Sequence, residues 1–307
     1  MTAATATAKP GRRRASRDAR RQAWVAWGFA APYMVFFAVF MLIPIVSSFA
    51  MSFTDFRAQD IPNPFAVGFV AFDQYTGLFR NAQFLNSLGV TFYFVLVGIP
   101  LTMAVALLLA LALNSGIERF RAVYRVGFYL PVVCSIVAVA VVWRFILQDE
   151  GVLNAALGAV GINGPNWLND TFWAMPAMIL MAVWRNVGTL MIIFLAGLQG
   201  IAPEMKEASA VDGATIWRRF VHITLPLMRP TLLLGAILTS VGYLQFFEEP
   251  FVMTNGGPLN ATLSVSYFIY NQFGFGNYAA ASAGSYVLFV IIALLSLVQF
   301  RVLREKD

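Results

Sequence analysis

The sequence has 307 residues, of which 59% are hydrophobic and only 12% are charged. A soluble protein needs about a quarter of charged residues to cover its surface, so this composition excludes an ordinary soluble protein and indicates an integral membrane protein. The formal net charge of +6 could suggest a nucleic acid partner. The basic residues, however, lie in short blocks between apolar runs, which is typical of membrane topology, and we expect no nucleic acid to bind.

Six apolar stretches are long enough to cross a hydrocarbon core of roughly 30 Å, which takes about 20 helical residues. They are Trp24–Ser48, Ser87–Leu113, Val126–Leu147, Phe172–Leu198, Thr231–Met253 and Ala279–Phe300. The expected fold class is therefore an all-α membrane protein with six transmembrane helices. The single cysteine, Cys134, lies in an apolar run and is expected to pack there.

The distribution of basic residues predicts the orientation of the chain. Lys and Arg are concentrated before the first span, between the second and third, between the fourth and fifth, and after the sixth. Because cytoplasmic loops carry an excess of Lys and Arg, both termini are expected in the cytoplasm. Residues 1–23 are expected to form a disordered basic cytoplasmic tail, 24–303 the transmembrane domain, and 304–307 a second cytoplasmic tail.

The first apolar run has to be distinguished from the core of a targeting signal. It is too long for the core of a secretory signal, and no small-residue cleavage site follows it. The Arg-rich, acid-poor start also resembles an organelle transit peptide. Since a six-span protein with cytoplasmic termini already accounts for these arginines, we interpret the run as the first span. Of the loops expected outside, Gly151–Val160 is predicted to form a short helix at the membrane interface.

The cytoplasmic segment between the fourth and fifth spans, about residues 199–230, is too patterned for a simple connection. Pro203 followed by Glu204 predicts the start of a helix, and Gly213 is suited to end it in the left-handed conformation. A second short helix is predicted over about Ile216–Thr224, stopping at Pro226. The segment would thus be a helix–turn–helix at the membrane surface, with one short helix available to a partner. The alternative is an ordinary amphipathic hairpin lying on the bilayer.

The segment contains Glu207-Ala208-Ser209, Gly213, Ile223 and Leu225-Pro226, separated by three, nine and one residues. In this it resembles the permease subunits of bacterial binding-protein-dependent ABC importers, whose motif is Glu-Ala-Ala, three residues, Gly, nine residues, Ile, one residue and Leu-Pro. The departure from this motif is Ser209 in place of the second alanine. The form Asp212-Gly213-Ala214 is similar to that of the carbohydrate branch, which includes the maltose and glycerol-3-phosphate permeases.

The resemblance implies a type I importer permease fold in the bacterial inner membrane, translocating a sugar or sugar-like solute into the cytoplasm by alternating access. It implies a heterodimer with a second six-span permease, two ATPase subunits and an extracytoplasmic solute-binding protein. ATP and Mg would belong to the ATPase, so no cofactor and no catalytic residue are expected in this chain, which also lacks a Gly-x-x-x-x-Gly-Lys-Ser/Thr phosphate loop. The resemblance assigns ATPase coupling to Glu207, Ala208, Ser209, Asp212, Gly213, Ala214, Ile223, Leu225 and Pro226.

Polar side chains inside the fourth and fifth spans are candidates for the solute path, because charged groups in a span usually face a cavity or a partner. They are combined with aromatic rings, as is usual in sugar sites. The candidates are Trp184, Arg185, Asn186, Tyr243, Gln245, Phe246 and Glu248, with Glu249 beside them. The alternatives are a structural cation at Arg185, packing for the aromatic rings, and exposure at headgroup level for at least one of the two carboxylates.

Other classes of function fit less well. His222 is the only histidine, without a second histidine or cysteine nearby, so no metal site is expected. A secondary transporter would show related repeats with broken helices, and no clear internal repeat is present. The alternatives that remain are a secondary transporter and an ABC permease for a solute other than a sugar.

Overall fold

The computed structural model describes residues 17–64, 66–115, 121–205, 209 and 213–303. These residues form helices and loops, with one isolated β-bridge between Thr54 and Phe69. The predicted all-α fold class is therefore confirmed. The chain divides into two compact units, Met1–Met51 and Ser52–Asp307. Of the disordered tail predicted over residues 1–23, residues 17–23 lie in a helix, whereas residues 1–16 and the predicted tail at 304–307 lie outside the described residues.

The first unit is a helical rod. It consists of α1 (Arg17–Phe37), a π-helical turn η1 (Ala38–Leu42) and α2 (Ile43–Met51). Its apolar part, Arg20–Met51, is long enough to cross a membrane. None of the residues in its most apolar stretch is buried within the chain. A helix that is hydrophobic all round without covering neighbours is suited to lipid or to a partner helix. The first predicted span is thus present as a helix.

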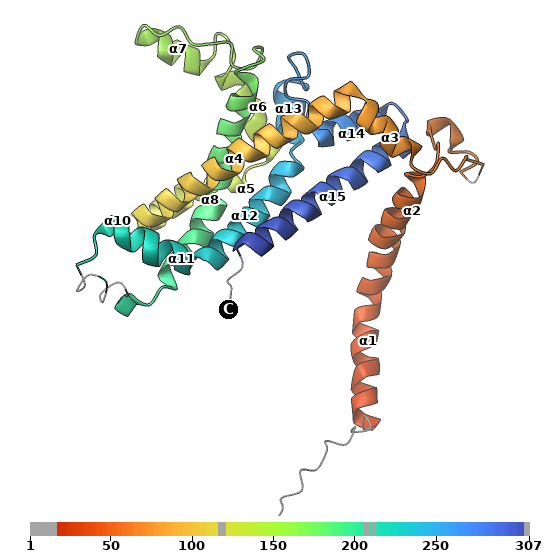
Figure 1. Cartoon of the computed structure of the whole chain (residues 1–307), viewed down its shortest axis with the longest axis horizontal. Helices are drawn as coiled ribbons and strands as arrows, with labels where there is room; N and C mark the ends of the chain where they lie inside the picture. The colour runs from red at the N-terminus through yellow and green to blue at the C-terminus, as the bar shows by residue number, and fades with distance from the viewer. Residues whose placement is uncertain (1–16, 65, 116–120, 206–208, 210–212, 304–307) are drawn as a thin grey trace, which may run out of the picture. The chain divides into compact units, whose positions relative to one another are not determined.

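The second unit contains the other helices for which the structure describes both ends. They are η2 (Ala58–Asp60), α3 (Asp73–Arg80), α4 (Ala82–Ser115), α5 (Arg121–Val133), α6 (Ile136–Ile146), α7 (Val152–Ala159), α8 (Ala174–Gln199), α10 (Ile216–Arg219), η3 (Phe220–Thr224), α11 (Leu225–Leu227), α12 (Arg229–Leu244), α13 (Glu248–Met253), α14 (Val265–Gly274) and α15 (Tyr278–Leu303). Helix α8 is central, packing against α4, α5 and α12 (Figure 1). In the most apolar stretch of α8, 61% of the residues are buried within the chain. The corresponding share for α15 is 22%, which leaves most of that helix for lipid.

The remaining predicted spans correspond to α4, the pair α5–α6, α8, the pair α12–α13, and α15. Two of them are not straight. Helices α5 and α6 meet at an angle of 98°, shortly after Pro131, which has no amide hydrogen to continue the helix. The fifth span is interrupted at 245–247, between α12 and α13. Cys134, which we expected to pack in an apolar interior, is instead exposed at the α5–α6 break.

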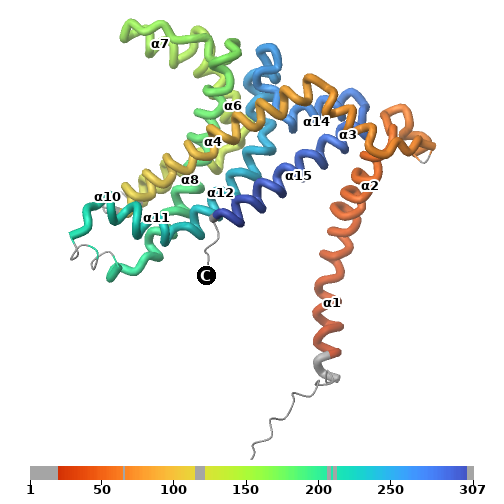
Figure 2. Tube along the Cα trace, viewed as in Figure 1, coloured from red at the N-terminus to blue at the C-terminus, as the bar shows by residue number. Residues whose placement is uncertain are grey.

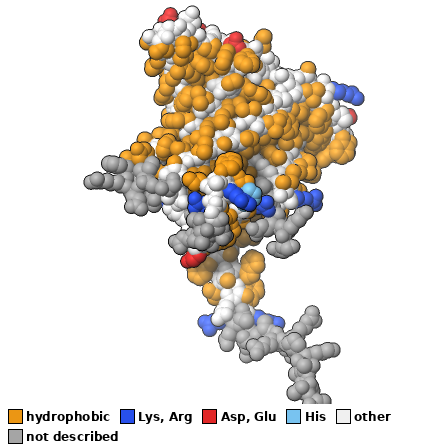
Figure 3. Space-filling view, turned by 60° about the vertical axis from the view of Figure 1, so that its left-hand side comes forward, with side chains coloured by type: hydrophobic (Ala, Val, Ile, Leu, Met, Phe, Trp, Pro, Cys, Tyr) orange, Lys and Arg blue, Asp and Glu red, His pale blue; other side chains and the backbone are white. Residues whose placement is uncertain are grey.

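Several elements of the second unit gather at one or the other of its two ends. In Figure 2, α10 and the C-terminal ends of α4 and α15 lie toward one end of the second unit, and α7 and α14 lie toward the other. Figure 3 shows hydrophobic side chains over most of the visible face, with Lys and Arg gathered beside the single histidine, His222. The short helix predicted over Gly151–Val160 is present as α7, over Val152–Ala159. Its position is held by Asn154, which accepts a hydrogen bond from Trp167 Nε1 at 2.7 Å.

Helices α5 and α8 approach each other closely at Gly188. A Cβ atom added there would collide with the carbonyl of Phe128 and lie 3.0 Å from the Cα of Tyr129. Backbone atoms cannot move aside as flexible side chains can. The contact therefore requires glycine and fixes the distance between the two helices.

We expect Gly188→Ala to lower the melting temperature of the purified permease, because the methyl group forces α5 away from α8, with a typical cost of overpacking of about 1–3 kcal/mol. Thermal unfolding in detergent measures the effect. Gly127→Ala on α5 is the matched control, since no atom lies within 4 Å of the added Cβ. Equal melting temperatures for the two variants would contradict the close contact.

Candidate functional site

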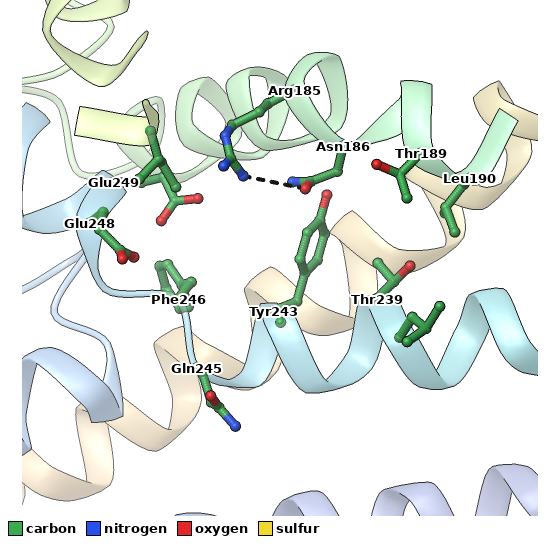
Figure 4. Close-up of a pocket in the computed structure, with 13 residues that line it drawn as sticks. Arg185, Asn186, Thr189, Leu190, Thr239, Tyr243, Gln245, Phe246, Glu248 and Glu249 are labelled. Carbon is green, nitrogen blue, oxygen red and sulfur yellow. Dashed lines mark hydrogen bonds between the residues drawn. The ribbon is translucent and has the colours of Figure 1, made fainter. Parts of the chain in front are cut away.

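A cavity of about 310 Å³ lies in the second unit, beside both helix breaks. Its walls come from α6, α8, α12, α13 and the residues between the last two (Figure 4). They combine polar and apolar side chains. The lining residues are Ile136, Arg185, Asn186, Thr189, Leu190, Leu238, Thr239, Gly242, Tyr243, Gln245, Phe246, Glu248 and Glu249.

A chain of polar groups crosses this region and connects three helices. The Tyr243 hydroxyl of α12 lies 2.7 Å from the Thr102 hydroxyl of α4, which donates a hydrogen bond to the Gly98 carbonyl at 2.7 Å. Figure 4 shows the Tyr243 hydroxyl directed toward Asn186 of α8. Asn186 donates to the Ala182 carbonyl at 2.8 Å. The polar wall is therefore positioned by hydrogen bonds to the helix backbones.

The aromatic rings of the cavity pack against a buried ring of α4. Phe246 stacks on Phe94 with ring centroids 4.0 Å apart, and the Tyr243 ring lies 4.9 Å from the same ring. All three side chains are buried. The ring faces of Tyr243 and Phe246 thus contribute to packing, and the cavity wall combines apolar side chains with a few hydrogen-bonding groups.

Two charged side chains of the cavity are incompletely satisfied. Glu249 is 5% exposed, and its Oε2 atom has no hydrogen-bond partner. Arg185 donates only a long bond of 3.5 Å from a terminal nitrogen to Asn186 Oδ1, and its Nε has no partner. The alternative that a carboxylate is exposed at headgroup level therefore does not hold for Glu249, which is buried. Glu248 is partly exposed.

Most of the predicted solute-path residues meet at this cavity. Six of the predicted residues line it together, namely Arg185, Asn186, Tyr243, Gln245, Phe246 and Glu248. Trp184 is not among the lining residues; it is 44% exposed and contacts Trp143, with ring centroids 5.7 Å apart. Sequence reasoning missed Thr189 and Thr239. The helical period was the available signal, because each lies four residues from a predicted residue on the same helix face.

The predicted coupling segment is described in part. Glu207, Ala208 and Asp212 lie outside the described residues. Ser209 is buried, and its carbonyl accepts a hydrogen bond from the Ala214 amide at 3.1 Å. Gly213 has a φ of +72°, the left-handed conformation predicted for it. The side chain of Thr215 then caps α10 by accepting a hydrogen bond from the Arg218 amide at 3.3 Å.

We predicted that the second helix of this segment stops at Pro226, and the structure shows that it continues past this residue. Helix α10, the π-helical turn η3 and α11 follow one another without a gap to Leu227, and α12 begins at Arg229. The wider turn ends two residues before Pro226, as η1 ends two residues before Pro44 in the first unit. An inserted residue relieves the collision between a proline ring and the preceding turn. Ile223, Leu225 and Pro226 are therefore parts of a nearly continuous connection to α12.

Groups that could hold a metal ion are absent from the described ranges: no three His, Cys, Asp or Glu side chains cluster there. The only histidine, His222, is exposed, and its Nδ1 lies 3.1 Å from the Arg218 carbonyl of the preceding turn. The arrangement offers hydrogen bonds and charge for binding a solute.

Residues 25–304 match the family described as the binding-protein-dependent transport system inner membrane component. The chain is 35% identical to the lactose transport system permease protein LacF of Rhizobium radiobacter, over 91% of this chain and 94% of that protein. The structure of a bacterial ABC transporter involved in the import of the acidic polysaccharide alginate has a TM-score of 0.78 at 25% identity, covering 94% of this chain and 97% of that chain. The structure of a bacterial alginate ABC transporter in complex with an alginate pentasaccharide-bound periplasmic protein has a TM-score of 0.77 at 26% identity, covering 94% of this chain and 96% of that chain.

Proposed function

Because the chain belongs to the family of binding-protein-dependent transport system inner membrane components, we propose that its cavity and its coupling segment are the two working parts of an importer. The chain is a multi-pass permease subunit of a sugar ABC importer in the bacterial plasma membrane. It is not an enzyme, since ATP hydrolysis belongs to a separate ATPase. The importer works with a solute-binding protein outside the membrane.

The cavity is proposed as this chain's share of the solute path. The observation that carries the proposal is the convergence of Arg185, Asn186 and Tyr243 with the α12–α13 break on one open volume. Helices that are interrupted inside a membrane are tolerated where they line a cavity or are covered by protein. The α5–α6 break also borders this volume, through Ile136. Both breaks are points at which the walls can change direction during alternating access.

The coupling segment is proposed to transmit ATPase motion to the helices that carry the cavity. Its support is the direct connection from Gly213 through α10, η3 and α11 into α12, which ends at the cavity. A displacement of α10 would thus reach Tyr243 through a path that is helical except for the turn at Met228. We propose Ser209, Gly213, Ala214, Ile223, Leu225 and Pro226, together with Glu207, Ala208 and Asp212, as the ATPase-coupling residues.

The complete transporter is proposed to contain this chain, a second six-span permease, two ATPase subunits that bind ATP and Mg, and the binding protein. Both termini and the coupling segment are placed in the cytoplasm. Residues 24–303 form the transmembrane domain in this arrangement, between the tails at 1–23 and 304–307. The position of α10 beside the C-terminal ends of α4 and α15, at one end of the second unit, supports this orientation (Figure 2).

Uptake of radiolabelled lactose into vesicles containing the complete complex is expected to require ATP and the ATPase subunits. The physical reason is that this chain has no phosphate loop of its own, so the energy has to come from ATP hydrolysis by a separate subunit. Vesicles that lack the ATPase, or that contain it with ADP only, are the controls. Uptake that persists in either control would overturn the importer in favour of a secondary transporter.

A further inference from the structure

The charged groups of the cavity do not balance. Three charged side chains line it: the carboxylates of Glu248 and Glu249, and the guanidinium of Arg185. The other ten lining residues carry no charge. The walls therefore hold two acidic side chains against one basic side chain, in a region of low dielectric where charges act strongly.

Glu249 and Arg185 do not neutralise each other by direct contact. Glu249 is buried with Oε2 unpartnered, Arg185 has an unpartnered Nε, and no hydrogen bond joins the two side chains in the part of the chain that the structure describes. In Figure 4 both charged ends are directed toward the open volume between α8 and α13. A buried polar group without a partner is costly, so this site requires a ligand or water that can satisfy a carboxylate and a guanidinium together.

We propose that this pair of groups makes the cavity selective for neutral, polyhydroxylated sugars and against acidic ones, with Glu249 as the determinant. The inference rests on the proposed solute path and adds to it a class of substrate. It is not implied by the family, because the compared transporters include one for lactose and one for an acidic polysaccharide.

A hydroxyl group fits both unpartnered atoms. It donates its hydrogen to Oε2 of Glu249, and its oxygen accepts from Nε of Arg185. Adjacent hydroxyls of one sugar ring can therefore serve both side chains without bringing in a charge. A carboxylate only accepts hydrogen bonds. It can accept from Arg185 but has no hydrogen to donate to Oε2 of Glu249, so a carboxylate satisfies only one of the two unpartnered atoms.

The charge of the cavity can be measured without knowing the solute. A reporter cysteine is introduced as Thr189→Cys on the cavity wall, in a Cys134→Ser background that removes the native exposed thiol. The complete transporter in membrane vesicles is treated with methanethiosulfonate reagents of similar size that are cationic, anionic or neutral. The neutral reagent measures accessibility, and the ratio of the cationic to the anionic rate measures the potential at the wall.

We expect the cationic reagent to react faster than the anionic one by roughly tenfold, the lower end of the range for charged clefts, because Arg185 offsets part of the effect of the two acidic side chains. Glu249→Gln should reduce this ratio several-fold with little change in the neutral rate, and Arg185→Gln should increase it. Glu150→Gln is the matched control, because it removes the same charge outside this cavity.

Four outcomes would overturn a claim, and they show which claim fails. A faster anionic reaction, or a ratio unchanged by Glu249→Gln, would refute charge selection while ATP-dependent uptake leaves the importer standing. An equal reduction by Glu150→Gln would assign the effect to the overall charge of the protein and also refute it. A reporter that does not react with the neutral reagent would instead refute the proposed solute path itself.

Discussion

Replacing Gly213 with valine is expected to abolish ATP-driven uptake while the chain still reaches the membrane. Gly213 has a φ of +72° and lies between Ser209, which is buried, and the cap of α10 at Thr215. L-residues pay about 1–2 kcal/mol in this conformation, and the branched Cβ of valine makes the strain larger. The turn would adopt another conformation, and α10 would no longer continue from the preceding segment in the same direction.

The control for this prediction separates conformation from side-chain volume. Gly213→Asn should retain most of the uptake, because asparagine tolerates the left-handed region far better than other non-glycine residues. No atom lies within 4 Å of an added Cβ at this position, so a collision within the chain does not explain a loss. Vesicle uptake, ATPase rate and membrane content are measured for both variants. Uptake by Gly213→Val equal to that of the wild type would refute the coupling role.

The sequence predicted the features that depend on local pattern. Hydrophobic length alone located five helices that are long and apolar enough to cross a membrane, and a sixth span if the bent pair α5–α6 counts as one, because about 20 apolar residues have few uses outside a bilayer. The left-handed conformation of Gly213 followed from the chemistry of helix ends. Even Arg185 and Asn186 could be assigned to one site, since a charge within a span is costly unless it faces a cavity or partner.

Features that depend on distant contacts could not be predicted in this way. The interruption at 245–247 contains no proline or glycine, and it becomes understandable only once Phe246 is seen stacked on Phe94 of α4. The burial of Glu249 depends on the same change of chain direction. At Pro226 the prediction of a helix end was wrong, because a π-helical turn precedes the proline and allows the helix to continue past it.

The hydroxyl of Tyr243 provides the most direct test of the cavity as a solute path. It links α12 to α4 through Thr102 at 2.7 Å and is directed toward Asn186 on α8. Tyr243→Phe keeps the ring against Phe94 and removes only this group. Thr102 still has the Gly98 carbonyl as a partner, so we expect the melting temperature to change little.

Uptake by Tyr243→Phe should nevertheless fall by about tenfold, which corresponds to about 1.4 kcal/mol, within the range for one buried hydrogen-bonding group. Tyr243→Ala should lose uptake almost completely and also about 3 kcal/mol of stability, because it leaves a void where an aromatic ring was buried. Thr239→Val, one turn away on the same wall, is the matched control for removing a hydroxyl that bonds only its own helix, to the Gly235 carbonyl at 2.8 Å. If Tyr243→Phe transports as well as the wild type, the hydroxyl serves packing alone. A loss in Tyr243→Phe without a loss of melting temperature ties the group to the solute, because a purely structural role would change both together.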